Sequence, residues 1–179
     1  IVFTSPTSTF TSATSEKPFV QIENTTNDAE GSKLKFIKNR GSNNGANDDV
    51  VGLIEFEGTN NASEQHTFAQ FKVTAANVTN GQEGGKIQLL CANHDGGMEA
   101  GLVIEESSTD ATLNVTVGNG TSSVVTVPGD IDLAGSIDVD GTANLDAVDI
   151  DGNVNIAGGA SLGGNSLDIV HTAVDTKAV

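Results

Sequence analysis

The feature that most constrains this chain is a glycine-punctuated array over residues 128–170. Apolar residues one position apart recur along it, separated by turns that contain glycine. The glycines are spaced six apart in two series: Gly129, Gly135 and Gly141, then Gly152, Gly158 and Gly164. Each repeat, a short strand and a turn, has too little apolar surface to form a core alone. It must stack on neighbouring repeats or on the same repeat of other chains.

Both kinds of stacking predict a repetitive β-prism or β-helical shaft. The six-residue spacing breaks between Gly141 and Gly152, where a solenoid would need strict register, so a homotrimeric prism is favoured. The residues predicted to line the interchain core are Ile131, Leu133, Ile137, Val139, Val148, Ile150, Val154 and Ile156. The predicted turn residues are Gly135, Gly141, Gly152 and Gly158.

Residues 17–127 predict an all-β, antiparallel sandwich-like domain or meander. Short segments with β-branched or aromatic residues alternate with Gly/Asn/Asp turn clusters. The candidate strands are PFVQIEN, KLKFIKN, VVGLIEFEG, TFAQFKVTAANV, KIQLLCAN, GLVIEES and ATLNVTVG. Residues 1–16 are rich in Ser and Thr and predict a linker or docking arm, and residues 171–179 form a short tail.

Charge and composition exclude several classes of function. The chain has 24 acidic and 8 basic residues, a net charge of -16, which disfavours nucleic acid and anionic membrane surfaces. No apolar run reaches membrane-spanning length, so membrane insertion is not expected. The single cysteine, Cys91, lies in an apolar run and is predicted to be a buried small hydrophobe.

The aspartates of the array allow two interpretations. Asp138, Asp140, Asp149 and Asp151 alternate with apolar residues, which would place them on the solvent face of strands. Stacked carboxylates could instead bind Ca²⁺, the one cofactor considered, although neither an EF-hand nor a nonapeptide calcium repeat is met. Candidate catalytic and other cofactor-binding residues are absent from the sequence patterns. The histidines lack metal spacing, and a saccharide-cleaving groove normally needs the Trp or Tyr that this chain lacks.

The order of several motifs resembles a module of phage tail fibre proteins, particularly those of marine and cyanobacterial phages. The matching motifs are Ile22-Glu23-Asn24, Lys38-Asn39-Arg40-Gly41-Ser42, Gly52-Leu53-Ile54-Glu55-Phe56-Glu57-Gly58 and Thr79-Asn80-Gly81-Gln82-Glu83-Gly84-Gly85. The segment TANLDAVDIDGNVNIAGG is similar to the shaft repeats that accompany this module.

This resemblance implies a non-enzymatic, homotrimeric appendage on the virion surface. Its partners would be other virion proteins and a host surface receptor. Relatives often end in a self-cleaving trimerisation domain, which this sequence does not contain. Three alternatives stay open: a capsid-decorating head fibre, a bacterial or archaeal adhesin, pilin or surface-filament subunit, and a carbohydrate-degrading spike.

Overall fold

The computed structural model describes residues 7–145 together with residues 148, 150 and 154. The chain divides into two units, Ile1–Pro128 and Gly129–Val179. All regular elements in the described part of the chain are β-strands, and that part contains no helix. The predicted all-β class is therefore confirmed.

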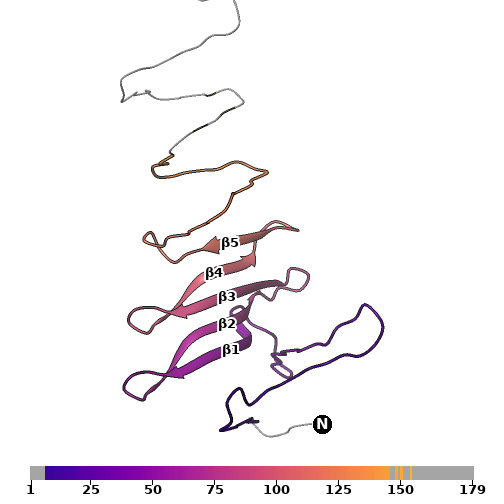
Figure 1. The fold of residues 1–179 in the computed structure, drawn as a ribbon. Coiled ribbons are helices and arrows are strands. Elements are labelled where there is room, and N and C mark those ends of the chain that lie inside the picture. Colours follow the sequence, from indigo (N-terminus) through magenta and orange to yellow (C-terminus); the bar gives the residue numbers. More distant parts are fainter. Residues whose placement is uncertain (1–6, 146–147, 149, 151–153, 155–179) are drawn as a thin grey trace, which may run out of the picture. The chain divides into compact units, whose positions relative to one another are not determined.

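The first unit contains one antiparallel sheet whose five strands follow one another in chain order, a meander (Figure 1). The strands are β1 (Asp49–Thr59), β2 (Gln65–Asn77), β3 (Gly84–Ala92), β4 (Met98–Glu106) and β5 (Leu113–Val117). They correspond to five of the seven predicted strands. Their connections are five or six residues long, which suffices to join antiparallel neighbours but not parallel strands.

Two of the hairpin turns have the same five-residue design. In the turns that begin at Asn60 and Asn93, the side-chain carbonyl of the asparagine accepts the backbone N–H groups of the third and fifth residues. These bonds measure 2.9 and 2.9 Å in the first turn and 3.0 and 2.9 Å in the second. The fourth residue has positive φ in both, 66° at Ser63 and 83° at Gly96. Asparagine thus satisfies turn donors that would otherwise lack a partner.

The strand register sorts the side chains into two distinct faces. Directly paired residues share a face, and successive residues alternate between faces. One row of paired residues is Gly52, Val73, Ile87, Ile104 and Val115. The next row on the same side is Ile54, Phe71, Leu89, Leu102 and Val117. Together with Phe56, Ala69 and Cys91, which form a third, shorter row, these residues are called the apolar face below.

The opposite side, called the polar face, carries the cross-strand polar pairs of the sheet. The Lys86 ammonium lies 2.8 Å from the Glu105 carboxylate on the neighbouring strand. The Gln70 amide donates to the Glu55 carboxylate at 2.8 Å across the β1–β2 pair. Ile54 and Phe56 on β1 therefore lie on the apolar face, and Glu55 between them lies on the polar face.

A second layer over the sheet is missing from the described residues. Among them no hydrophobic side chain is buried, and Thr74, 5% exposed, is the one buried polar residue. The predicted strands PFVQIEN and KLKFIKN are wrong: neither segment forms a strand, and residues 18–38 make no backbone hydrogen bond to the sheet. A strand needs a partner along its edge, and these segments have none.

One contact does bring this segment to the sheet. The Phe36 side chain lies against the backbone of Gly52 on β1, so that a Cβ on Gly52 would stand 3.1 Å from it. Leu34 and Phe36 share a hollow with Ile54 and Phe71 of the apolar face. The segment therefore covers the β1–β2 corner of that face and forms no sheet of its own.

The described part of the second unit follows the six-residue spacing of its glycines. The chain bends at residues 128–129, 134–135 and 140–141 and has no regular secondary structure between these bends. No strand is formed in this part, and nothing lies within 4 Å of where a Cβ would stand on Gly135 or Gly141. Gly152 and Gly158 lie outside the described residues, so the turn role of all four glycines in a shaft stays a prediction.

Candidate functional site

The apolar face of the sheet is the most unusual surface in the first unit. Its two complete rows contain no charged or hydrogen-bonding side chain. Six of its side chains are each between 38% and 60% exposed: Ile54, Phe56, Ile87, Leu89, Val115 and Val117. A contiguous apolar surface of this kind marks an interaction site on a soluble protein.

Cys91 lies on this face, which corrects the prediction that it is buried. It pairs with Ala69 of β2 and its side chain is exposed. The prediction failed because an apolar run such as IQLLCAN is buried only when a second layer covers it. Cys91 shares a hollow with Val117 and with Val124 and Val125, which follow β5.

Acidic side chains occur at the ends of the apolar face. Glu99 pairs with Cys91, and its carboxylate accepts a hydrogen bond from the Asn119 amide at 2.7 Å. The Glu106 carboxylate lies over Gly84, at the end of the β3–β4 pair. Because both carboxylates lie at the ends of the face, the two complete rows in its centre carry no charge.

An ion pair with two side-chain hydrogen bonds joins Arg40 to the start of β1. The Arg40 guanidinium donates two hydrogen bonds to the Asp49 carboxylate, one of them at 2.7 Å, and the Ala46 backbone N–H donates a third at 3.1 Å. The guanidinium first, and the backbone N–H second, lower the pKa of Asp49 to about 2. The pair anchors the preceding loop to the sheet. Sequence reasoning missed it because the two residues are nine positions apart, and the course of the turn that joins them is not specified by a local pattern.

The other perturbed groups are also held in structural contacts. The pKa of Glu83 is lowered because its carboxylate accepts hydrogen bonds from its own backbone N–H and from that of Gly81. The pKa of Lys86 is raised by its hydrogen bond to Glu105. Both shifts favour the charged form, so neither residue is poised to exchange a proton near neutral pH.

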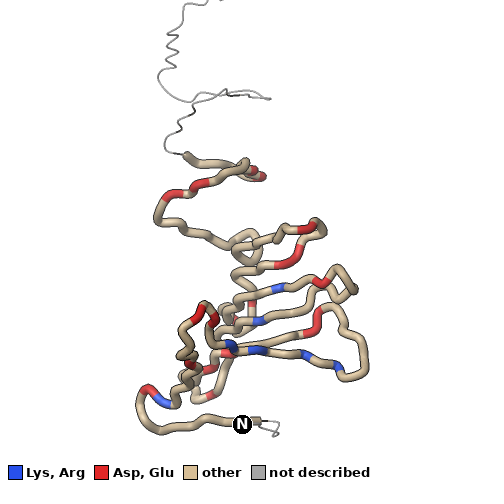
Figure 2. Tube along the Cα trace, turned by 90° about the vertical axis from the view of Figure 1, so that its right-hand side faces the viewer, with Lys and Arg blue, Asp and Glu red and all other residues tan. Residues whose placement is uncertain are grey.

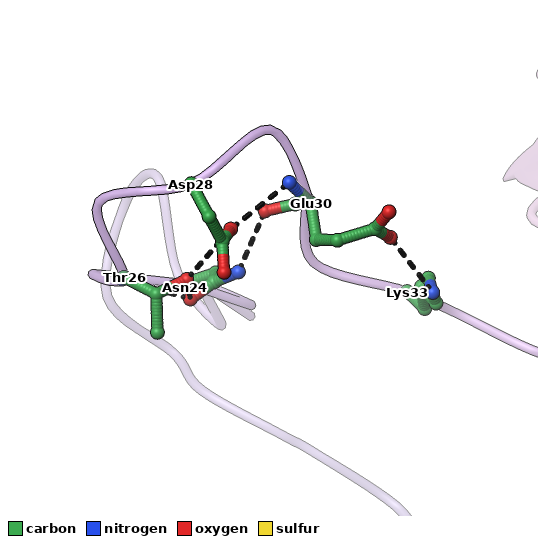
Figure 3. Close-up of polar contacts among 5 residues, drawn as sticks. All are labelled: Asn24, Thr26, Asp28, Glu30 and Lys33. Carbon is green, nitrogen blue, oxygen red and sulfur yellow. Dashed lines mark hydrogen bonds and ion pairs between the residues drawn. The ribbon is translucent and has the colours of Figure 1, made fainter.

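The acidic loop at residues 24–33, between the segments PFVQIEN and KLKFIKN, resembles a ligand cage (Figure 3). Its polar side chains, however, form hydrogen bonds and an ion pair within the loop. The Asn24 side chain accepts from the backbone and hydroxyl of Thr26, and its amide donates to the Glu30 carbonyl at 2.8 Å. The Asp28 carboxylate accepts from the Thr26 hydroxyl and the Glu30 backbone N–H. The Glu30 carboxylate pairs with Lys33 at 3.2 Å. These bonds define a turn, and we assign it no ligand.

The structure describes two of the four candidate calcium residues. Asp138 and Asp140 are exposed on the second unit, and Asp149 and Asp151 lie outside the described residues. No group of three or more His, Cys, Asp or Glu that could hold a metal ion occurs in the part of the chain that the structure describes. Figure 2 shows the excess of acidic over basic residues along the trace. Calcium binding by the array therefore stays a hypothesis.

The predicted interchain core residues are all on the surface of the single chain wherever they are described. Ile131, Leu133, Ile137, Val139, Val148, Ile150 and Val154 are between 50% and 72% exposed, and Ile156 lies outside the described residues. Their burial in an assembly stays a prediction.

The two histidines that the structure describes lie on different elements of the sheet. His66 lies on β2 with its ring nitrogen 3.7 Å from the Glu64 carboxylate, and His94 lies in the β3–β4 turn. His171 lies outside the described residues. The buried Thr74 hydroxyl has no hydrogen-bond partner, and its cross-strand neighbour Lys86 is engaged by Glu105.

No family model, curated protein or solved structure matches this chain. Among the described residues there is no helix long and apolar enough to cross a membrane.

Proposed function

We propose that this chain is a non-enzymatic structural component of a virion fibre, of the tail-fibre type, and that it works as a homotrimer. At the virion surface it would support or present a host-attachment surface, in contact with other virion proteins. The trimer is supported by the repeat, whose short extended segments cannot form a core alone, and by the break in glycine spacing that disfavours a solenoid.

The observation that carries this proposal is the open apolar face. Complete burial of an aliphatic or aromatic side chain contributes about 1.5–3 kcal/mol. Six side chains that are roughly half exposed therefore forgo on the order of 6 kcal/mol per chain. That amount is comparable to the whole stability of a small domain, about 5–15 kcal/mol, so the unassembled chain lacks much of the burial a stable fold requires.

The chemistry of the described residues supports a structural role. The charged groups with perturbed pKa values are engaged in ion pairs and turn hydrogen bonds that fix the loops and strands. Bond-making chemistry would need a nucleophile or acid–base pair brought together in a concave site. The proposal assigns no catalytic residue.

A capsid-decorating head fibre would share this structure and differ in where it docks. A subunit of a bacterial or archaeal surface filament is the alternative of a different class. It is favoured by PFVQIEN and KLKFIKN, which form no strand in the sheet and in which apolar and polar residues partly alternate as in a donated strand. A filament would polymerise without closing.

The test is the solution mass of the full chain by light scattering, with and without a calcium chelator. We expect three times the 18.2 kDa of one chain, unchanged by the chelator. A monomer at micromolar concentration would refute the assembled fibre. An open-ended polymer would favour the filament, and a mass that falls on chelation would assign calcium to the assembly.

A further inference from the structure

We infer that the apolar face of the five-stranded sheet is a contact surface between copies of this chain, and that the same face of a second copy covers it. This inference rests on the assembly proposed above and adds where the copies meet. The sheet would then make an interchain contact of its own, in addition to the contact predicted for the array at residues 128–170.

The distribution of charge selects this face over the opposite one. A chain with a net charge of -16 repels its copies, so two copies associate best across a surface without carboxylates. The polar face carries Glu55, Lys86 and Glu105 among its paired residues. The two full rows of the apolar face carry no charge, and Glu99 and Glu106 lie at its ends.

The chemistry of the face favours a second copy over an unrelated partner. Interfaces that select one foreign partner carry fixed polar groups whose hydrogen bonds give specificity. The central rows here offer only hydrocarbon, from β-branched, leucine and phenylalanine side chains. In a closed trimer every copy turns the same patch toward the threefold axis, and an uncharged sheet face can pack there against the same face of its neighbours.

The apolar face alone is smaller than a standard protein interface, so the contact would also include neighbouring residues. Five strands about 4.8 Å apart and rows spanning about 16 Å along the strands give a flat footprint of roughly 400 Å² per chain. A standard interface buries about 800 Å² per partner. Val124, Val125 and Val127, which follow β5 in the same unit and are exposed, supply further apolar surface.

Among the described residues, no segment of the chain covers the centre of the face. Leu34 and Phe36 fill a hollow at the β1–β2 corner, and the residues after β5 line another beside Cys91. Between these corners Ile87 and Leu89 stay 38% and 44% exposed. The uncovered centre is where the second copy is expected.

The test measures thiol reactivity at two adjacent positions of β5. Val115 lies on the apolar face, and Thr116, next to it, lies on the polar face in a row with Val103. Both are exposed in the single chain. The variants Val115→Cys and Thr116→Cys are each made in a Cys91→Ala background, and their labelling by a maleimide is timed on samples of known mass.

In the assembled chain, we expect the Val115→Cys thiol to react at least about tenfold more slowly than the Thr116→Cys thiol, because it reacts only when the contact opens. Native Cys91 should be protected likewise. Dilution that dissociates the assembly should make the two variants equally reactive.

Other outcomes overturn the inference in distinguishable ways. Equal reactivity in a sample that is oligomeric would place the interface elsewhere and leave the proposed fibre standing. Protection of Val115→Cys in a sample that is monomeric would show that the chain's own segments cover the face, against both the inference and the assembly. Equal reactivity in a chain that stays monomeric at every concentration tested would overturn both as well.

Discussion

Individual residues in this chain hold loops and turns in place around the sheet. The guanidinium of Arg40 and the backbone N–H of Ala46 converge on the Asp49 carboxylate, whose side chain is only 14% exposed. The pair of Glu30 and Lys33, in contrast, is largely exposed on both sides and contributes little. The first of these contacts predicts a measurable dependence on pH.

Replacing Arg40 by Ala should raise the pKa of Asp49 from about 2 toward its ordinary value of 3.8. Since the folded-state pKa is the lower one, the stability contributed by Asp49 is complete above about pH 4 and is lost as the pH falls toward 2. Arg40→Ala should therefore be less stable at neutral pH and lose less stability between pH 4 and 2. An NMR titration of the Asp49 carboxyl and acid unfolding followed by circular dichroism would check this. Lys33→Ala is the control and should change neither; an unshifted Asp49 pKa in Arg40→Ala would contradict the prediction.

At the scale of elements, the hairpins are built from one local design used twice. The turns after β1 and β3 share an asparagine cap and a fourth residue with positive φ. Glycine adopts this conformation freely, whereas a residue with a Cβ pays for it. The second turn has glycine at this position and the first has Ser63, so the sequence offers its own comparison.

Ser63→Gly should stabilise the β1–β2 hairpin by about 1 kcal/mol, and Gly96→Ser should destabilise the β3–β4 hairpin by a similar amount. Thermal unfolding at a fixed chain concentration would measure both. Ala62→Gly, one residue earlier and without positive φ, is the matched control and should lower stability. A rise with Ala62→Gly equal to that with Ser63→Gly would show that backbone strain at Ser63 is not the cause.

The whole molecule is organised by apolar surface that one chain leaves open. In the first unit this surface is one face of a sheet, and in the described part of the second unit it is a series of apolar pairs between bends. The two units expose the same kind of side chain through different local structures. If both contribute to assembly, a charge placed in the array should weaken association without disturbing the sheet.

Ile137→Asp should raise the concentration needed for half-assembly by at least about tenfold, because a carboxylate would replace an apolar side chain in the predicted interchain core. For a trimer this is about a hundredfold in the dissociation constant, or about 2.8 kcal/mol per trimer. Ser136→Asp adds the same charge at the neighbouring position, where alternation directs the side chain outward, and should assemble normally. Light scattering over a dilution series gives both values, and circular dichroism confirms that the strands persist. Unaltered assembly of Ile137→Asp would reject the shaft.

The sequence by itself determined the local structure of this protein. The strands β1 to β5, the alternation of Ile54 and Phe56 with glutamates, and an antiparallel arrangement follow from side-chain period and turn residues, which act over a few positions. The number of layers was decided only by tertiary structure. PFVQIEN has the strand pattern yet finds no edge to pair with, and Cys91 lies in an apolar run yet stays exposed. A residue is buried only if a segment distant in the sequence packs over it. The alternation of side chains along a strand specifies which face a residue occupies, but it does not specify what covers that face.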